Sequence, residues 1–427
     1  GGITRCHSVA VAHRAGCVDG RPLMPAGAVP DSSDALGAHI NHDERVVAAA
    51  IAALPGIGPQ RLRTFIGALG VMSTWHVVRG EMRAPEHITA VLQHDNLHHA
   101  VRRAATSQLL DQMAESLHAG NIRVLLACDA EYPASLRDDF AAPAVLFARG
   151  TLAAFNNRRV GIIGTRAASA AGRHFARQLG RDLAQSGVSV VSGLARGIDA
   201  AAHRGAISRS ADDDDTQHDA TTNTGAPIAV VASGLDVVYP REHAALWQHV
   251  AERGVIIGES PPGCAPDAFR FPLRNRILAA VSEILVVVES RATGGSMITV
   301  DDAARRGVTV MAVPGSPHSE TSAGTNALIS DGAATVCDAT DVMVALGLDH
   351  HRHAASSDAR TRPLPADRVV LDALARRPMT FEQIVAEVNL PLQDVAMSLG
   401  RLDAQGWAVV NGGWWEALLA MRAATTV

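Results

Sequence analysis

The chain has 427 residues, of which 47% are hydrophobic and 19% are charged, as is typical of a globular protein with two or three domains. Its net charge of −5 excludes a general electrostatic attraction to nucleic acid, so any nucleic-acid site must be a local basic patch. The chain has arginine but no lysine, which excludes Schiff-base chemistry and a Walker-type ATP loop.

Cysteine usage and hydrophobic patterning limit the class of protein further. Five scattered cysteines, none in a Cys-x-x-Cys pair, favour a reduced cytoplasmic protein without disulfides or a zinc ribbon. No apolar run approaches the roughly 18 residues of a membrane-spanning helix. Residues 1–42 are rich in Gly, Ala, Pro and Ser and lack the apolar core of a signal peptide, so we expect a disordered tail.

Residues 43–127 are predicted to form a small helical domain. The segment Leu54-Pro55-Gly56-Ile57-Gly58-Pro59 lies between two predicted helices and is typical of a helix-hairpin-helix (SAM-like) domain. The turn of such a hairpin can present N–H groups to a DNA phosphate. A purely structural hairpin is the favoured interpretation, because the hairpin has no clear second copy.

Residues 128–346 are predicted to form the core of the protein, and within them residues 150–340 alternate short β-branched strands with helical stretches. This alternation predicts an α/β core with a Rossmann-like, doubly wound and mostly parallel sheet. We expect strands at 159–163, 188–191, 228–232, 255–258, 284–288, 308–312 and 334–336.

Two polar segments are predicted to be flexible. Residues 208–225 form an acidic insertion in the core, in which Asp212–Asp215 are more typical of a solvated loop than of a metal site. Residues 347–364 form a linker, whose histidines have no partner cysteine and are interpreted as incidental: His350, His351 and His353. We therefore predict neither a metal nor another cofactor.

Residues 365–427 have the pattern of a winged helix. We expect a first helix over 366–376, a second that opens with a capping box at Thr380–Gln383, and a third over 392–405. A hairpin over 407–415 would have Asn411-Gly412 in its turn. The third helix is nearly neutral, so a protein-contact or regulatory role is favoured over DNA binding.

Two strand–glycine–helix turns stand close together in residues 160–203. The first is Gly164-Thr165-Arg166, and the second is Ser192–Asp199 after the next strand. Such a turn directs backbone N–H groups and the positive end of a helix dipole at one point, which suits an anion. Parallel strands place the two turns side by side at the carboxyl edge of the sheet. Residues 158–206 carry eight arginines against two aspartates, so this edge is expected to bind a polyphosphate strand.

A dinucleotide cofactor is the obvious alternative ligand for such turns. Its fingerprint requires Gly-x-Gly-x-x-Gly after the first strand and an acidic residue at the end of the second. The first turn has only the first of these glycines, Gly164, and the second strand ends in Ser192-Gly193. The architecture is therefore predicted to be Rossmann-like without the cofactor signature.

These turns, together with motifs further along the chain, resemble the DNA-processing protein A family (DprA, also called Smf). The similarity extends in order from about residue 130 to about residue 340. The matching segments are Gly164–Arg166, Ser192–Asp199 with Ala202-His203, Gly234–Asp236 with Tyr239-Pro240, Gly258–Ser260, Phe271–Arg276, Gly295–Thr299, Pro314-Gly315, and Gly324–Ile329 with Gly332-Ala333.

The resemblance implies a single-stranded DNA-binding protein and not an enzyme. It implies that the protein protects incoming strands during natural transformation, or competence, and loads the RecA recombinase onto them for recombination. It also implies a homodimer formed through the core. Composition and spacing alone indicate neither RecA loading nor the dimer.

The turns supply the first group of expected DNA-binding residues. Asp199 and His203 have helical spacing but are interpreted as structural, because no third residue or metal supports hydrolysis. Arg196 is about equally suited to a phosphate and to holding Asp199. The residues expected to present N–H, hydroxyl or guanidinium groups to phosphates are Gly164, Thr165, Arg166, Ser192, Gly193 and Arg196.

By resemblance, a second group lines the DNA pocket. An aromatic ring, an amide and two guanidinium groups can stack on and hydrogen-bond to splayed bases, and this group comprises Phe271, Arg274, Asn275 and Arg276. The family often has a basic residue just before this stretch, where this chain has Asp267-Ala268, and Arg270 is the nearest substitute. Gly295 and Ser296 precede a helix and offer another anion site.

An enzyme of related fold is the main alternative, such as a nucleotide phosphoribohydrolase of the lysine-decarboxylase-like group. Those enzymes carry Pro-Gly-Gly-x-Gly-Thr-x-x-Glu with a catalytic glutamate. Here Pro314-Gly315-Ser316 and Gly324-Thr325-Asn326 are separated, and no glutamate follows. A nucleotide-sensing module that signals through the winged helix is a third alternative, which a preference for mononucleotides would favour.

Overall fold

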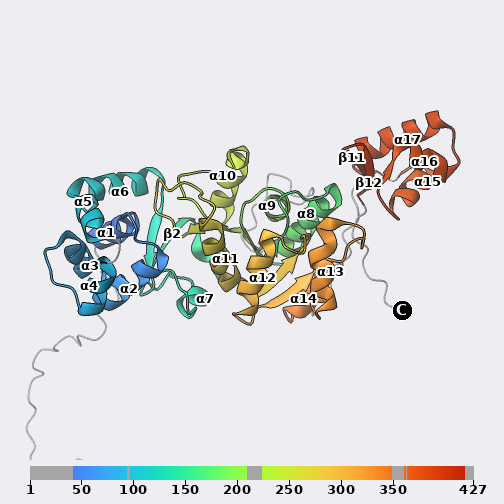
Figure 1. Cartoon of the computed structure of the whole chain (residues 1–427). Coiled ribbons are helices and arrows are strands. Elements are labelled where there is room, and N and C mark those ends of the chain that lie inside the picture. Colours follow the sequence, from blue (N-terminus) through green and yellow to red (C-terminus); the bar gives the residue numbers. More distant parts are fainter. Residues whose placement is uncertain (1–41, 94–96, 209–223, 349–359, 362, 419–427) are drawn as a thin grey trace, which may run out of the picture. The chain divides into compact units, whose positions relative to one another are not determined.

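The computed structural model describes residues 42–93, 97–208, 224–348, 360–361 and 363–418 (Figure 1). Nearly all of the predicted tail, most of the acidic insertion with Asp212–Asp215, and most of the linker with its three histidines lie outside these residues. In the part of the chain that is described, no helix is long and apolar enough to cross a membrane.

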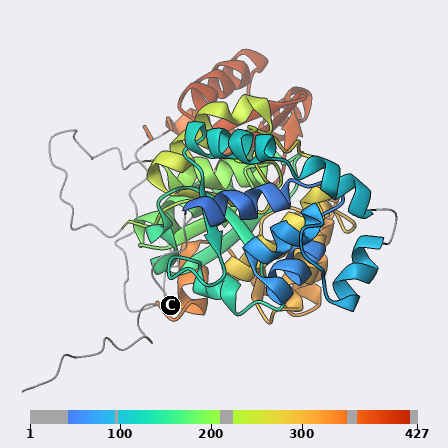
Figure 2. The same cartoon turned by 90° about the vertical axis from the view of Figure 1, so that its left-hand side faces the viewer.

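Helices precede the sheet and form one group, blue to cyan in Figure 2. Pro59 begins the second helix, where its missing N–H costs nothing, and glycines with positive φ end the second and third helices. Leu62 and Phe65 form a buried stripe at helical spacing. The helices are α1 (His42–Ala52), α2 (Pro59–Leu69), α3 (Val71–Arg79), α4 (Glu86–Gln93), α5 (Leu97–Ala104) and α6 (Ser107–Ala119).

A nine-stranded sheet forms the core, in the order β1-β2-β6-β5-β4-β3-β7-β8-β9. The strands from β6 to β9 in this order pair in parallel, whereas β2 pairs antiparallel with both β1 and β6. The strands are β1 (Arg123–Leu126), β2 (Val145–Gly150), β3 (Arg159–Ile163), β4 (Ser189–Ser192), β5 (Ile228–Val231), β6 (Val255–Gly258), β7 (Ile284–Val287), β8 (Thr309–Ala312) and β9 (Ala334–Thr335).

The predicted α/β class with a mostly parallel sheet is confirmed, and each of the seven predicted strands is present within one residue at either end. The prediction of a purely helical segment up to residue 127 is wrong, because Arg123–Leu126 forms β1. The antiparallel strands β1 and β2 were not predicted, since they precede the regular alternation of strands and helices.

Helices cover both faces of the sheet, so its strands are apolar on both sides. On one face, α8 (Ala170–Gln185), α9 (Ile198–Ala206) and α14 (Ala339–Ala345) pack against residues such as Val160 and Ile162. On the other, α11 (Arg270–Val281) and α12 (Gly295–Ala304) pack against Ile163 and Leu285. The remaining helices of the core are α7 (Ala134–Arg137), α10 (Ala244–Arg253), α13 (Ala323–Ser330) and the short 3-10 turns Leu152–Asn156, Arg241–His243 and Glu320–Ser322.

The strand order reverses at β3, which determines where a ligand can bind. From β3 the chain continues to β4, β5 and β6 on one side, then crosses to β7, β8 and β9 on the other. In doubly wound sheets, ligands bind outside the carboxyl ends of the strands at this switch point. The loops after β3 and β7 meet there, with the loop after β4 beside them.

The described C-terminal elements form a separate small core around residues such as Val370, Ile384 and Leu399. The predicted capping box is present: the Thr380 hydroxyl accepts from Gln383 N, and the Gln383 amide oxygen accepts from Thr380 N at 3.0 Å. The hairpin turn is Gly412-Gly413, and not Asn411-Gly412, because Asn411 already pairs with Trp414. The elements are α15 (Pro365–Leu374), β10 (Met379–Thr380), α16 (Phe381–Val388), α17 (Leu392–Ala404), β11 (Ala408–Asn411) and β12 (Trp414–Ala417).

Candidate nucleic-acid interface

Two backbone N–H groups of the turn after β3 form hydrogen bonds within the protein. Thr165 N donates to the main-chain oxygen of Glu289 at 2.7 Å, and Ala167 N donates to the Thr165 hydroxyl at 3.3 Å. Gly164 lies against Ile198, where there is no room for a side chain. What the turn leaves at the surface is the exposed side chain of Arg166.

The turn after β4 is also internally satisfied. Ser192 is buried, and its hydroxyl donates to the main-chain oxygen of Ile162 at 2.6 Å. Gly193 N donates to Oδ2 of Asp199 at 3.2 Å. Neither the Ser192 hydroxyl nor the Gly193 N–H is therefore free for a phosphate in this structure.

Asp199 and Arg274 form a buried charged centre beneath this turn. Burial raises the pKa of the Asp199 carboxyl, and the Arg274 charge opposes that rise. Burial likewise lowers the pKa of Arg274, whose Nη1 donates to the main-chain oxygen of Val230 at 2.5 Å. His203, one helical turn after Asp199, is fully buried, and desolvation lowers its pKa to about 4. This interior setting fits the structural role expected for Asp199 and His203.

Three side chains from different elements meet above the buried centre, and we call them the arginine–aromatic cluster: Arg166, Tyr239 and Phe271. The Arg166 guanidinium lies over the Phe271 ring, 4.7 Å from its centroid, and the Tyr239 ring is 5.8 Å from that of Phe271. A small hollow beside the cluster is lined by Gly193, Ala195 and Arg274, among others. Within the described residues, no acidic side chain lies within ion-pair distance of Arg166, so its charge is available to a ligand.

Arg196 projects from the same edge but has a partner. Its guanidinium forms a two-pronged ion pair with the Glu242 carboxylate, with Nη2 to Oε2 at 3.0 Å, and both side chains are exposed. Hydrogen bonding to Arg196 lowers the pKa of Glu242 to about 2, so the pair stays charged at neutral pH. Asp199 is held by backbone N–H groups, and Arg196 does not contact it in this structure.

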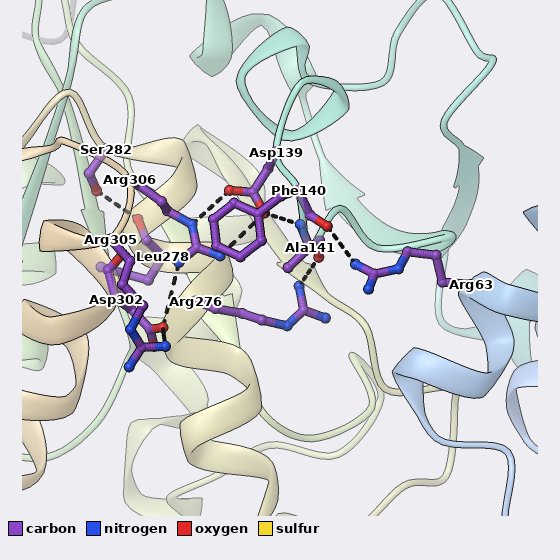
Figure 3. A network of polar contacts seen from close by, with 10 residues as sticks. All are labelled: Arg63, Asp139, Phe140, Ala141, Arg276, Leu278, Ser282, Asp302, Arg305 and Arg306. Atoms are coloured by element: carbon purple, nitrogen blue, oxygen red, sulfur yellow. Dashed lines mark hydrogen bonds and ion pairs between the residues drawn. The ribbon is translucent and has the colours of Figure 1, made fainter.

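Arg276 lies in an interior network and not in the cluster (Figure 3). It forms an ion pair with Glu259 and donates to the main-chain oxygen of Ala141 at 2.5 Å. Ala141 belongs to the loop Asp139–Ala141, which two further arginines hold. Arg306 binds both carboxylate oxygens of Asp139 at 2.7 and 3.2 Å, and Arg63 donates to Phe140 O at 3.0 Å. These contacts indicate a structural role for Arg276.

A cavity of about 450 Å³ adjoins the small hollow. The segment Ala52–Pro59, the ends of β5 and β6, and the first half of α11 line it, and Arg274 lines both spaces. Arg270 lines the cavity and lies 3.5 Å from Asp267 and 3.4 Å from the Ser260 hydroxyl. Asn275 is half-buried on α11.

The second anion site expected from the sequence lies at the start of α12. Gly295 is exposed, with open space where a side chain would be. The Ser296 hydroxyl donates to that of Ser290 at 2.7 Å, so it stabilises the loop after β7.

Three residues of the edge were not among the expected site residues: Tyr239, Glu242 and Glu289. The Tyr239-Pro240 motif drew attention to the first, but nothing in its spacing indicates a contact with Phe271. Glu289 is the second residue after β7, and an acid near the end of a strand beside the switch point is the signal that would have identified it.

Comparison with known proteins provides independent evidence. Residues 123–347 match the family model of DNA recombination-mediator protein A. The chain is 37% identical over 287 residues to the DprA-type protein of Mycobacterium tuberculosis. This match covers 65% of this chain and 69% of that relative. It is 32% identical over 301 residues to protein Smf of Escherichia coli, with 68% and 76% covered. The structure of DprA from Streptococcus pneumoniae matches with a TM-score of 0.56 at 26% identity, covering 71% of this chain and 98% of that one.

Proposed function

The chain belongs to the DNA recombination-mediator protein A (DprA) family, and on this premise we propose that it binds single-stranded DNA at the carboxyl edge of its sheet. The arginine–aromatic cluster carries the proposal. An exposed guanidinium held over an aromatic ring can contact a phosphate and stack on a base. Aromatic rings beside a cationic groove are what an unpaired strand requires, since its bases are free to stack.

In the proposed DNA binding, the turns after β3 and β4 position arginine side chains more than they donate hydrogen bonds to phosphates. The turns that contain Gly164 and Gly193 carry Arg166 and Arg196 to the edge. Internal acceptors bind Thr165 N, the Ser192 hydroxyl and Gly193 N. Arg270, Asn275, Gly295 and Ser296 remain proposed contacts further along the edge. Arg274 and Arg276 are proposed to support the site from below, because their guanidinium groups are bound within the protein.

The test is a titration with fluorescent dT oligomers of increasing length at several salt concentrations. We expect affinity that rises with length and falls with salt, because each phosphate contact releases counterions. Arg166→Ala should weaken binding by about tenfold or more and reduce the salt slope by about 0.7, the contribution of one phosphate contact. Arg166→Lys should keep the salt slope but lose affinity, because an ammonium group does not stack as a guanidinium does.

Two matched variants complete the experiment. Arg196→Ala should cost less affinity than Arg166→Ala, because Arg196 must first leave Glu242. Arg305→Ala removes an exposed charge at the end of α12, outside the site, and should leave binding unchanged. Binding that is independent of oligomer length, or unaffected by Arg166→Ala, would reject this site and favour a nucleotide enzyme or sensor.

Family membership also leads us to propose the wider role. The protein would act in the cytoplasm as a homodimer without enzymatic activity, protect incoming single strands during natural transformation, and load RecA onto them. A direct test is the rate of RecA filament formation on dT oligomers coated with single-strand-binding protein. The full chain should accelerate this rate, and Arg166→Ala should not.

We propose that the C-terminal elements form a winged helix that contacts protein and not DNA. Arg401 is the one arginine of α17, and it is bound to Asp367 at 3.0 Å. Leu392 and Met397 of the same helix are exposed. A recognition helix for DNA would instead present free basic and amide groups to the bases.

A further inference from the structure

The switch point of the sheet has a helix that would ordinarily receive a phosphate. In doubly wound nucleotide-binding proteins, the phosphate binds at the N-terminus of the helix that follows the first strand. In this chain that helix is α8, a 16-residue helix that begins after Ser169 beside the carboxyl ends of β3 and β7.

The side chain of Glu289, which follows β7, already occupies this position. Its Oε2 accepts from Ser169 N at 2.9 Å, and its Oε1 accepts from the Ser169 hydroxyl at 2.6 Å. The same hydroxyl accepts from Gly172 N at 2.9 Å and so caps α8. Only 9% of Glu289 is exposed, so its carboxylate is part of the interior. The Glu416 carboxylate of β12 also accepts from Ala171 N at 3.2 Å, so two carboxylates meet the positive end of α8, as a phosphate would.

A glycine admits this carboxylate to the helix. A Cβ at Gly172 would lie only 2.6 Å from Oε1 and 2.7 Å from Oε2 of Glu289. In the dinucleotide fingerprint, a glycine serves the same purpose by letting the pyrophosphate approach the backbone. The chain has therefore kept the geometry of an anion site and filled it with its own side chain.

Glu289 also shapes the neighbouring turn. Its main-chain oxygen accepts from Thr165 N at 2.7 Å, directly before Arg166. The residue that fills the helix N-terminus is thus the one that holds the turn from which Arg166 projects.

We infer that Glu289 is an internal substitute for a ligand phosphate, which closes the mononucleotide site of the fold and so determines specificity. The Glu289 carboxylate prevents free nucleotides and pyrophosphate from binding at the start of α8. Anionic ligands can then bind only at the surface of the sheet's carboxyl edge, where a DNA strand can extend. The occupation of the mononucleotide site by Glu289 does not depend on the proposed DNA binding. The conclusion that it favours a DNA strand over a free nucleotide rests on that proposed function.

The test measures pyrophosphate and AMP binding to the full chain by calorimetry. The unaltered protein should bind neither at α8, so any millimolar binding that it shows should be lost when Arg166→Ala is added. A variant with both Glu289→Ala and Glu416→Ala, which removes the two carboxylates at the start of α8, should gain saturable pyrophosphate binding, at least about tenfold tighter than any binding by the unaltered protein. Glu289→Gln keeps the shape, and its amide oxygen can accept from Ser169 N while its amide nitrogen donates to the Ser169 hydroxyl, so it should gain none. Glu320→Gln removes the same charge from an exposed site and serves as the matched control.

Two results would overturn the inference. One is saturable pyrophosphate binding by the unaltered protein or by Glu289→Gln that persists when Arg166→Ala is added, a result that counts even if the Glu289→Ala, Glu416→Ala variant does not fold. The other is a folded Glu289→Ala, Glu416→Ala variant, shown by an unchanged circular dichroism spectrum, that gains no binding. The dT titration of Arg166→Ala separates this outcome from failure of the proposed function, because it does not involve the α8 site.

Discussion

The turns after β3 and β4 share a sequence pattern and differ in what fills them. In the first, the Glu289 carboxylate comes from a neighbouring strand and binds the start of α8. In the second, Asp199 comes from the helix that the turn itself begins, and binds the turn from below. Both turns therefore hold an internal carboxylate, one supplied from a distance and one supplied locally.

The shared pattern of the two turns is compatible with different anions. A strand that ends in glycine before a helix predicts a concentration of N–H groups, but it does not predict which anion will satisfy them. Here the N–H groups of Thr165, Ala167 and Gly193 bond within the protein, and the side chains of Arg166 and Arg196 are exposed. Recognition at this edge is therefore expected to depend on guanidinium and aromatic groups more than on backbone N–H groups.

The largest expected effect comes from removing the local carboxylate. Asp199→Ala leaves the buried charge of Arg274 uncompensated and the Gly193 N–H unpaired, so we expect a loss of about 3–5 kcal/mol in the free energy of unfolding. Urea denaturation measures it. Glu242→Ala removes an exposed carboxylate from the same edge and should leave the stability unchanged. A small loss for Asp199→Ala would mean that the second turn does not depend on its acid.

Acid should lower the stability of the folded protein through His203, which lies on α9. Its folded pKa of about 4 lies below its ordinary value of 6.5, so between these values the unfolded chain binds more protons than the folded one. Stability therefore falls as pH drops from about 6.5 to 4, by up to about 3 kcal/mol. His203→Leu should flatten this part of the stability profile, whereas His318→Gln, at an exposed site, should not. An unchanged slope in His203→Leu would contradict the assignment.

A smaller effect compares the two glycines that admit the carboxylates. At Gly193 a Cβ would lie 2.6 Å from both the Arg274 guanidinium carbon and Asp199 Oδ2, and at Gly172 it would meet Glu289. Either alanine substitution should cost about 1–3 kcal/mol, with Gly193→Ala the more costly because Arg274 is held by Val230. Thermal unfolding measures the difference. Gly67→Ala, where space is open in α2, is the control and should not destabilise the protein.

Much of the fold could be predicted from the sequence. The β-branched runs of the parallel strands from β3 to β7 are buried on both faces and give clear apolar segments. The strands β1 and β2 are also apolar, but they were not recognised because only the four-residue helix α7 lies between them, which gives no clear alternation of strand and helix. Residues 123–126 also directly follow a long helical stretch.

For the candidate site, the sequence predicts which residues lie at the carboxyl edge of the sheet, but not which partners their side chains contact. Arg166, Arg196 and Phe271 lie at the expected edge, whereas Arg274 and Arg276 turn inward. For Arg274 a signal existed: it precedes Ile277 and Leu278 by three and four residues, so a helix places it on their buried face. The partners of Arg276, by contrast, lie 17 and 135 residues away in the chain, and no local pattern reports them.

The loop at Asp139–Ala141 has a consequence for the order of folding. Asp139 and Arg306 are only 6% exposed in their side chains and are separated by 167 residues. A carboxylate cannot leave water until its counter-charge arrives, and bringing such distant segments together has a high entropic cost. Asp139 must therefore stay hydrated until the end of α12 has been synthesised and docked, so this corner of the core closes late, after the local helices and hairpins.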